Sequence, residues 1–279
     1  MSSRALARGG HPEGLAATRR TDRWWVEPLL TVAVLGLFGV YATWAAFQGA
    51  HYYASPYLSP LYSPVLFTDL SAPGAAPVWH AAFGEWPDNR PWPDFLPRSP
   101  ALMILFVPGI FRLTCYYYRK AYYRAFAGSP PGCAVVPVAK KARSYRGETA
   151  WLLFQNLHRY AFYLALAFLP ILLADAVAAF FHEGRFGMGV GSLVLTLNFC
   201  LLGGYTLGCH SCRHLFGRSD CMSCGKATPR YKTWRIVTWF NERHGLFAWC
   251  SLVWVGLSDV YVRLVSMGVI HDLNTWGHG

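Results

Sequence analysis

The sequence predicts an all-α membrane protein: five transmembrane helices in a bundle, with the N-terminus cytoplasmic and the C-terminus outside. Three observations lead to this fold class. Of the 279 residues, 14% are charged and 54% are apolar, whereas soluble chains average about 25% charged residues. The charges cluster between neutral runs, each long enough for the roughly 20 residues that a membrane-crossing helix needs. The Lys and Arg residues are concentrated in alternate connections.

This uneven distribution of cations predicts the orientation. Five, seven and seven Lys or Arg residues fall in three segments, at 1–28, 119–149 and 211–243. Only three in total fall in the connections between them, at 51–98, 182–187 and 271–279. Cytoplasmic loops carry such an excess. The net charge of +11 therefore follows from topology, and no nucleic-acid partner is predicted.

The first helix is predicted at 29–50, after a polar cytoplasmic tail at 1–28. A Pro-rich outer loop follows at 51–99. Prolines at such short intervals prevent a long helix, and we expect this loop to fold as a cap over the outer face. Its function cannot be read from the sequence.

The second helix is predicted at 100–118 and is the weakest of the five, because Pro108 and Arg112 interrupt it. Arg112 lies only two turns before a basic run, and we expect its side chain to extend toward that run. A basic cytoplasmic loop at 119–150 completes this part of the chain.

The rest of the chain is predicted to contain three more spans, a cysteine-rich loop and an outer tail. They are predicted as a third helix at 151–181, a fourth at 186–208, a cytoplasmic Cys-rich loop at 209–233, an interfacial helix with the fifth span at 234–270, and an outer tail at 271–279.

Ionisable residues inside the spans are candidates for function, because a central charge costs about 2.5 to 3.5 kcal/mol on insertion scales. Asp259 and Arg263 are four residues apart and can pair on one helix face, which favours a structural role. Asp175 has no such neighbour in the sequence. It is predicted to handle protons in the outer half of the membrane.

The Cys-rich loop carries the strongest chemical motif. Its four cysteines form two Cys-x-x-Cys pairs separated by eight residues: Cys209, Cys212, Cys221 and Cys224. Cytoplasmic thiols stay reduced, and pairs at this spacing bind zinc or iron–sulfur clusters. From spacing alone, a structural zinc knuckle is favoured. The isolated cysteines are interpreted as apolar packing residues: Cys115, Cys133, Cys200 and Cys250.

Two histidines are predicted at the same membrane surface. His158 opens the third span and His244 opens the fifth. A Rieske-type 2Fe–2S centre needs two thiolates and two imidazoles, so these histidines and two of the four cysteines could provide its ligands. Two histidines on separate helices can also bind haem b. Iron–sulfur, zinc and haem therefore stay open as alternatives.

A stripe of aromatic and polar residues accompanies His158 on the third helix. Trp151, Gln155 and Arg159 fall on one helical face with it. A flat ring with nearby donors suits a quinone and its carbonyl oxygens. These three residues are predicted to bind quinone.

The chain resembles a known family of membrane subunits. The stretches that support this are "QNLHRYAFYLAL", "GCHSCRHLFGRSDCMSCGK" and "WFNERHGLFAW", together with the five-helix plan. They resemble the membrane anchor of succinate dehydrogenases and fumarate reductases, and most closely its actinobacterial (mycobacterial) branch, which carries a Rieske-type cluster in the membrane subunit. The resemblance covers roughly residues 25 to 270.

The resemblance implies a succinate:quinone oxidoreductase of the bacterial plasma membrane. Its flavoprotein and iron–sulfur subunits would dock on the cytoplasmic face, and electrons from succinate would reach quinone or menaquinone. This chain would not oxidise succinate on its own. The first, second and fourth spans have no histidine in mid-membrane, which argues against two haems. The direction of the reaction and any higher oligomer of the complex stay open.

Overall fold

The computed structural model describes residues 14–75, 81–86, 92–93, 95–138, 152–217 and 228–277, with the backbone alone for 152–156. Its contacts divide the chain into two units. The first contains Met1–Gly36 and Tyr116–Leu152, and the second contains Leu37–Cys115 and Leu153–Gly279. The second is called the bundle unit below.

Four long helices in the described residues could each cross a membrane by length and composition. They are α1 (Val26–Gln48), α5 (Leu152–Ala178), α6 (Val190–Leu207) and α9 (His244–Ser266). A bent pair, formed by the segments Pro100–Thr114 and Tyr116–Ala125, adds a fifth if it counts as one span. The all-helical membrane fold is therefore confirmed with four or five spans, while the orientation of the termini stays a prediction.

The second predicted helix differs most from the structure, because it is broken twice. It consists of α2 (Pro100–Ile104) and α3 (Phe106–Thr114), and α4 (Tyr116–Ala125) follows in the first unit. Pro108 in α3 cannot donate a backbone hydrogen bond. Cys115 has extended backbone torsions and ends α3. The helix predicted at 100–118 therefore stops short of Cys115.

The side chains on the bundle helices are arranged for an apolar solvent. Leu37 and Val40 on α1 are 72% and 74% exposed. Large apolar residues on the other long helices are also exposed, among them Leu164, Leu173, Leu193 and Leu257. Such extensive exposed apolar surface marks a membrane interface. The lipid bilayer that the sequence predicts would cover it.

Helices α6 and α9 pack closely because small residues line their contact. A Cβ atom on Gly204 would lie 2.4 Å from the Phe247 ring. Small residues let membrane helices approach in this way. The indole nitrogen of Trp254 on α9 donates to the carbonyl oxygen of Val194 at 3.0 Å, which ties the same two helices together.

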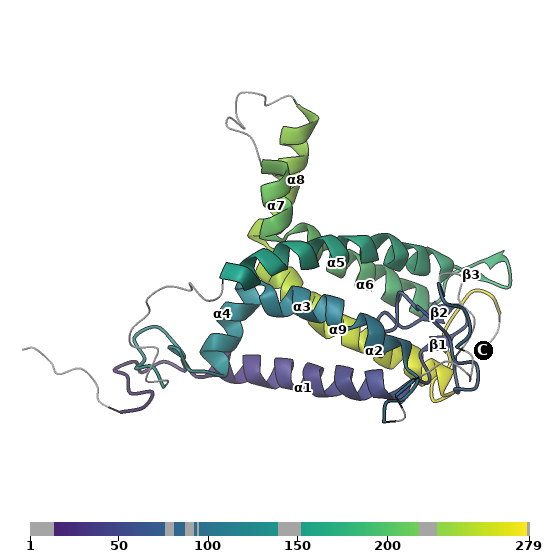
Figure 1. The fold of residues 1–279 in the computed structure, drawn as a ribbon, viewed down its shortest axis with the longest axis horizontal. Coiled ribbons are helices and arrows are strands. Elements are labelled where there is room, and N and C mark those ends of the chain that lie inside the picture. The colour runs from purple at the N-terminus through teal and green to yellow at the C-terminus, as the bar shows by residue number, and fades with distance from the viewer. Residues whose placement is uncertain are drawn as a thin grey trace, which may run out of the picture. The chain divides into compact units, whose positions relative to one another are not determined.

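Two ends of the bundle unit can be distinguished in Figure 1. At one end, α7 (His210–Gly217) and α8 (Pro229–Glu242) pack side by side and project from the long helices; we call this the α7–α8 end. At the other, called the loop end, lie the antiparallel strand pairs β1 (Tyr53–Ala54) with β2 (Tyr57–Leu58) and β3 (Phe181–His182) with β4 (Arg185–Phe186).

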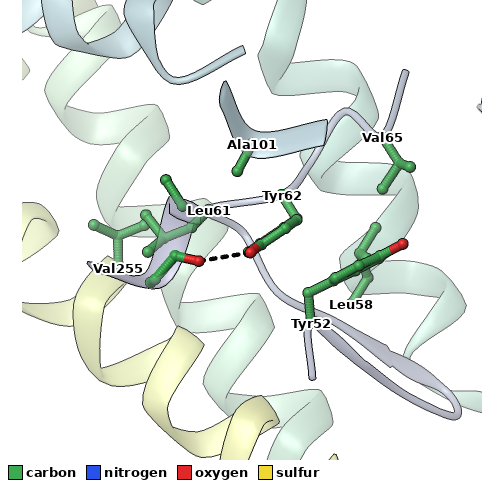
Figure 2. Packing of buried hydrophobic residues seen from close by; sticks show 9 residues of the cluster. Tyr52, Leu58, Leu61, Tyr62, Val65, Ala101 and Val255 are labelled. Carbon is green, nitrogen blue, oxygen red and sulfur yellow. Dashed lines mark hydrogen bonds between the residues drawn. The ribbon is translucent and has the colours of Figure 1, made fainter. Parts of the chain in front are cut away.

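The Pro-rich loop supplies much of the core at the loop end. Tyr52 and Tyr62 are fully buried and stack with ring centroids 4.4 Å apart. The Tyr62 hydroxyl donates to the carbonyl oxygen of Ala45 on α1 at 2.6 Å, as Figure 2 shows. Leu61 and Val65 pack in the same cluster. This part of the loop is folded into the bundle unit, while residues 76–80, 87–91 and 94 lie outside the described ranges.

The predicted ion pair inside the fifth span is confirmed. The Arg263 guanidinium approaches the Asp259 carboxylate to 3.3 Å on α9, and both side chains are buried. Ser59 and Tyr41 also donate to this carboxylate. A second nitrogen of Arg263 donates to the carbonyl oxygen of Ala50 at 2.7 Å. The pair thus connects α9 to α1 and to the loop.

In the first unit, the segment before α1 contacts the segment after α4. Thr18 and Val135 form an antiparallel bridge. Arg20 donates to the carbonyl oxygen of Cys133 at 3.0 Å and pairs with Asp22. Much of the predicted cytoplasmic tail and of the basic loop, at residues 1–13 and 139–151, lies outside the described ranges.

Candidate metal centre and the adjoining cavity

Two thiol–imidazole pairs lie near the α7–α8 end of the bundle unit. His158 Nε2 lies 3.0 Å from Cys209 Sγ, and Cys115 Sγ lies 3.5 Å from His244 Nε2. All four side chains are buried, with exposed fractions between 1% and 8%. We call this group the donor set.

Each donor sits at or near the end of a helix. Cys209 follows α6 and precedes α7, and Cys115 ends α3. His244 is the first residue of α9, and His158 lies in the second turn of α5. The donors therefore come from four separate places in the sequence, which helix packing brings together.

Gly208 permits the close approach that places Cys209. A Cβ atom on Gly208 would lie 2.8 Å from the carbonyl oxygen of Gly204 and 2.9 Å from that of Phe240. The Asn241 amide donates to the Gly208 carbonyl oxygen at 2.7 Å. A side chain at position 208 would thus collide with backbone on two helices.

Thr114 fixes the tautomer of His158. Its hydroxyl donates to the carbonyl oxygen of Ile110 at 2.6 Å, and its Oγ1 lies 2.9 Å from His158 Nδ1. A hydroxyl has one hydrogen, so the ring N–H at Nδ1 donates to Thr114. The lone pair of neutral His158 is then on Nε2, which faces Cys209. This is the arrangement that metal-binding histidines adopt.

Aromatic rings hold both imidazoles in place. The Phe111 ring stacks on His158 at 5.0 Å with planes 5° apart, and the Tyr205 ring stacks on His244 at 4.9 Å with planes 13° apart. Phe111 and Tyr205 also meet edge to face at 5.3 Å. The two histidines are therefore backed by one aromatic layer.

Burial keeps the thiols protonated in the metal-free chain. It raises the pKa of Cys209 to about 12, with a further contribution from the neighbouring Cys115 thiol. Burial also raises the pKa of Cys212 to about 11. A bound metal ion would have to displace these protons, so its binding would release protons to solvent.

Three of the six predicted metal ligands take part in the two thiol–imidazole pairs. His158, His244 and Cys209 belong to the donor set. Cys212 is buried on α7, and Cys221 and Cys224 lie outside the described residues. Within the described ranges no three Cys, His, Asp or Glu side chains converge on one point. The donors come as two pairs.

Sequence reasoning missed Cys115, which was interpreted as an apolar packing residue. It is the fourth member of the donor set. The sequence contains one signal, because Cys115 follows closely after Pro108, which weakens the helix. That signal predicts that a helix ends here, but it does not identify His244 as the neighbour of the Cys115 thiol.

Arg112 also differs from expectation. Instead of extending toward the basic run, its guanidinium donates to Ala248 O at 3.2 Å and Ser251 Oγ at 2.9 Å on α9. It also lies 4.5 Å from the centroid of the Tyr205 ring. From α3, the Arg112 side chain reaches these partners on α9 and α6, and it therefore does not extend toward the headgroups.

A cavity of about 540 Å³ adjoins the aromatic layer. Phe111, Arg112 and Tyr205 line it on the side of the donor set, and Ser63 lines it on the side of the loop. Most of its wall is apolar, with residues from α1, α5 and α9 such as Phe38, Leu172 and Val255. A molecule in this cavity would be one ring away from both imidazoles.

The residues predicted to bind quinone are not found at this cavity. Trp151 and the Gln155 side chain lie outside the described parts. Arg159 is exposed on α5 and does not line the cavity. Their role stays a prediction. Asp175, predicted to handle protons, is buried and accepts a hydrogen bond from Ser63.

A bundle of four or five membrane helices with thiols and imidazoles buried at one end defines a class: multi-pass integral membrane proteins. A family model described as actinobacterial succinate dehydrogenase subunit SdhC matches residues 26–268, and the chain belongs to this family. The solved Mycobacterium smegmatis Sdh1 complex in the apo form contains a chain with 44% identity and a TM-score of 0.79, over 93% of this chain and 94% of that one. No curated protein sequence matches.

The predicted resemblance to the actinobacterial succinate dehydrogenase anchor is thus confirmed, while the Rieske-type cluster stays a prediction. The protein is the membrane subunit of succinate dehydrogenase, a succinate:quinone oxidoreductase complex. It is integral to the plasma membrane, and its partners are the other subunits of that complex.

Proposed function

We propose that this subunit holds a Rieske-type 2Fe–2S centre on Cys115, Cys209, His158 and His244 and passes electrons from its partner subunits to a quinone in the adjoining cavity. The observation that carries the proposal is the burial of two thiol–imidazole pairs against the wall of that cavity. The sequence predicted that two of the four cysteines in the Cys-rich loop bind the cluster. In the present proposal Cys209 is one thiol ligand, and Cys115 is the other in place of Cys212, Cys221 or Cys224.

The chemistry of the donor set fits such a centre. Two thiolates and two imidazoles are the ligands of a Rieske-type cluster. A Rieske-type centre has both thiolates on one iron and both imidazoles on the other, so each thiol–imidazole pair would supply one ligand to each iron. When bound, a 2Fe–2S cluster accepts and donates one electron at a time. The protein's own part is to orient the imidazoles through Thr114, Phe111 and Tyr205.

The cavity suits a quinone with an apolar tail. Its wall is largely aliphatic and aromatic, which favours an isoprenoid chain. Arg112 places a positive charge at the side nearest the donor set. This charge attracts a carbonyl oxygen and, more strongly, the anion formed when a quinone accepts an electron.

The partner subunits would dock at the α7–α8 end. The donor set lies near that end, and the predicted cytoplasmic segment 211–243 includes α8 and all of α7 except His210. Electrons arriving from a docked iron–sulfur subunit would then meet the donor set before the cavity.

Metal analysis and EPR spectroscopy of the purified complex test the proposal. Succinate should produce a 2Fe–2S signal beyond those of the partner subunits, and Cys115→Ser and Cys209→Ser should each abolish it. Cys200→Ala is the matched control, because Cys200 is exposed on α6. The signal should survive in that variant.

Other metal contents would contradict the proposal in specific ways. Zinc without additional iron would support a structural knuckle. A Soret change on reduction that disappears in His158→Ala or His244→Ala would support haem b. Loss of the EPR signal in Cys221→Ser, with Cys115→Ser unaffected, would return the ligand set to the Cys-rich loop.

A further inference from the structure

Two buried carboxylates lie near the loop end of the bundle unit, and one loop contacts both. Asp175 on α5 is 7% exposed and Asp259 on α9 is fully buried. Ser63 donates to Asp175 at 2.5 Å, and Ser59 donates to Asp259. The two serines are four residues apart in the Pro-rich loop.

The surroundings of the two carboxylates differ. Asp259 pairs with Arg263 and also accepts a hydrogen bond from Tyr41. This arrangement ties three segments together. Asp175 instead contacts a hydroxyl group that lines the cavity. A carboxyl group that contacts a hydroxyl group on the cavity wall can exchange a proton with the cavity through that hydroxyl group.

The position of Asp175 along α5 also places its carboxyl group close to the cavity. Ala165, Leu169 and Leu172 on the same helix line the cavity. Asp175 follows Leu172 by three residues and precedes the helix end at Ala178 by three. At a rise of about 1.5 Å per residue, each interval is roughly 4.5 Å. The carboxyl group therefore lies between the cavity and the connection to β3.

We propose that Asp175 and Ser63 form a proton-exchange site that supplies the cavity from the loop end. The proposal rests on the proposed function, in which the cavity binds quinone. Reduction of a quinone to a quinol consumes two electrons, which succinate oxidation supplies, and two protons. When Asp175 is protonated, the hydrogen bond reverses and the carboxyl group donates to Ser63 Oγ, which frees the Ser63 hydroxyl to face the cavity. The carboxyl proton then passes to Ser63 Oγ as the Ser63 hydroxyl proton passes to the quinone oxygen. Water at the loop end then reprotonates the carboxylate.

The test compares variants of the intact complex for succinate-driven quinone reduction. Asp175→Asn and Ser63→Ala should each slow this reaction about a hundredfold, the usual contribution of a positioned proton donor. Asp175→Glu and Ser63→Thr keep the carboxyl and hydroxyl groups and should restore most of the rate. Ser59→Ala is the matched control, because it removes the neighbouring serine while leaving Ser63 in place.

A second measurement follows the protons. Complexes in proteoliposomes are given succinate from outside, so that only those with an external dehydrogenase face react. A pH indicator trapped inside should report alkalinisation in the wild-type complex, and Ser63→Ala should reduce it. Succinate-dependent reduction of a soluble dye checks in each variant that the complex has assembled.

The outcomes separate the two proposals. If the EPR signal is present but Asp175→Asn and Ser63→Ala reduce quinone at the wild-type rate, the proton-exchange proposal is overturned and the proposed function stands. If quinone reduction persists and the vesicle interior does not become alkaline, protons come from the other face and this inference is also wrong. A complex without the extra iron–sulfur signal would instead contradict the proposed function.

Discussion

The two ends of the bundle unit use opposite chemistry to hold buried polar groups. At the loop end, charge and hydroxyl groups dominate, with the Asp259–Arg263 pair and its hydrogen bonds at the centre. At the α7–α8 end, soft thiols and neutral imidazoles are stacked on aromatic rings. The first arrangement pairs its two charges within the chain. The second has the composition of a metal site.

This difference indicates that the two ends of the bundle unit have different roles. An ion pair inside a membrane is retained when each charge has a partner, since a lone charge is costly there. The loop end therefore fixes the loop against α1 and α9. The donor set instead supplies soft ligands, which the proposed 2Fe–2S centre would use.

The largest expected effect comes from breaking the ion pair. Asp259→Asn leaves the Arg263 cation buried opposite a neutral amide, which should destabilise the complex by about 3 to 5 kcal/mol. Thermal unfolding in detergent and the yield of assembled complex measure this loss. Asp175→Asn is the comparison, because it removes a carboxylate without leaving this cation behind and should cost less. Equal losses in the two variants would contradict the distinction between the carboxylates.

A smaller loss is expected at Gly208. Gly208→Ala places a Cβ atom against two backbone carbonyl oxygens, and such overpacking typically costs about 1 to 3 kcal/mol. The shift should also move Cys209 and lower the iron content attributed to the donor set. Gly203→Ala is the control, because a Cβ atom at Gly203 meets nothing within 4 Å. Normal iron content in Gly208→Ala would show that this close approach does not position the thiol.

The smallest expected effect concerns Thr114. Thr114→Val removes the acceptor of the His158 Nδ1–H bond, and loss of such an outer contact typically weakens metal binding about 10- to 100-fold. Iron retained during titration with a chelator measures this affinity, with little change expected in thermal stability. Thr114→Ser keeps the hydroxyl and should behave like the wild type. If Thr114→Val and Thr114→Ser retain iron equally well, a group other than Thr114 orients His158.

Several parts of the architecture could be predicted from the sequence, because they depend on local pattern. Four apolar helices are found within a few residues of the predicted spans. The Asp259–Arg263 pair follows from a spacing of four residues on one helix. His158 and His244 were identified because each is a polar residue at the start of an apolar helix. Periodicity is sufficient for all of these.

The donor set could be only partly predicted, because its members come from distant parts of the sequence. The Cys-x-x-Cys motif drew attention to Cys209 because of its spacing, whereas Cys115 has no cysteine close to it in the sequence. The structure brings Cys115 within 3.5 Å of a histidine 129 residues further on. Arg112 was assigned to the headgroup region for the same reason, since its contacts on α9 are not visible in the local pattern.

The sequence by itself determined that this chain crosses a membrane several times, that it belongs with succinate dehydrogenase anchors, and that thiols and imidazoles are present near one surface. Only the tertiary structure decided which thiol meets which imidazole, and that an aromatic layer separates them from a cavity linked to Asp175. The physical reason is that helix periodicity fixes the face on which a residue lies, while its neighbour on another helix depends on where that helix breaks and how closely its glycines allow it to pack.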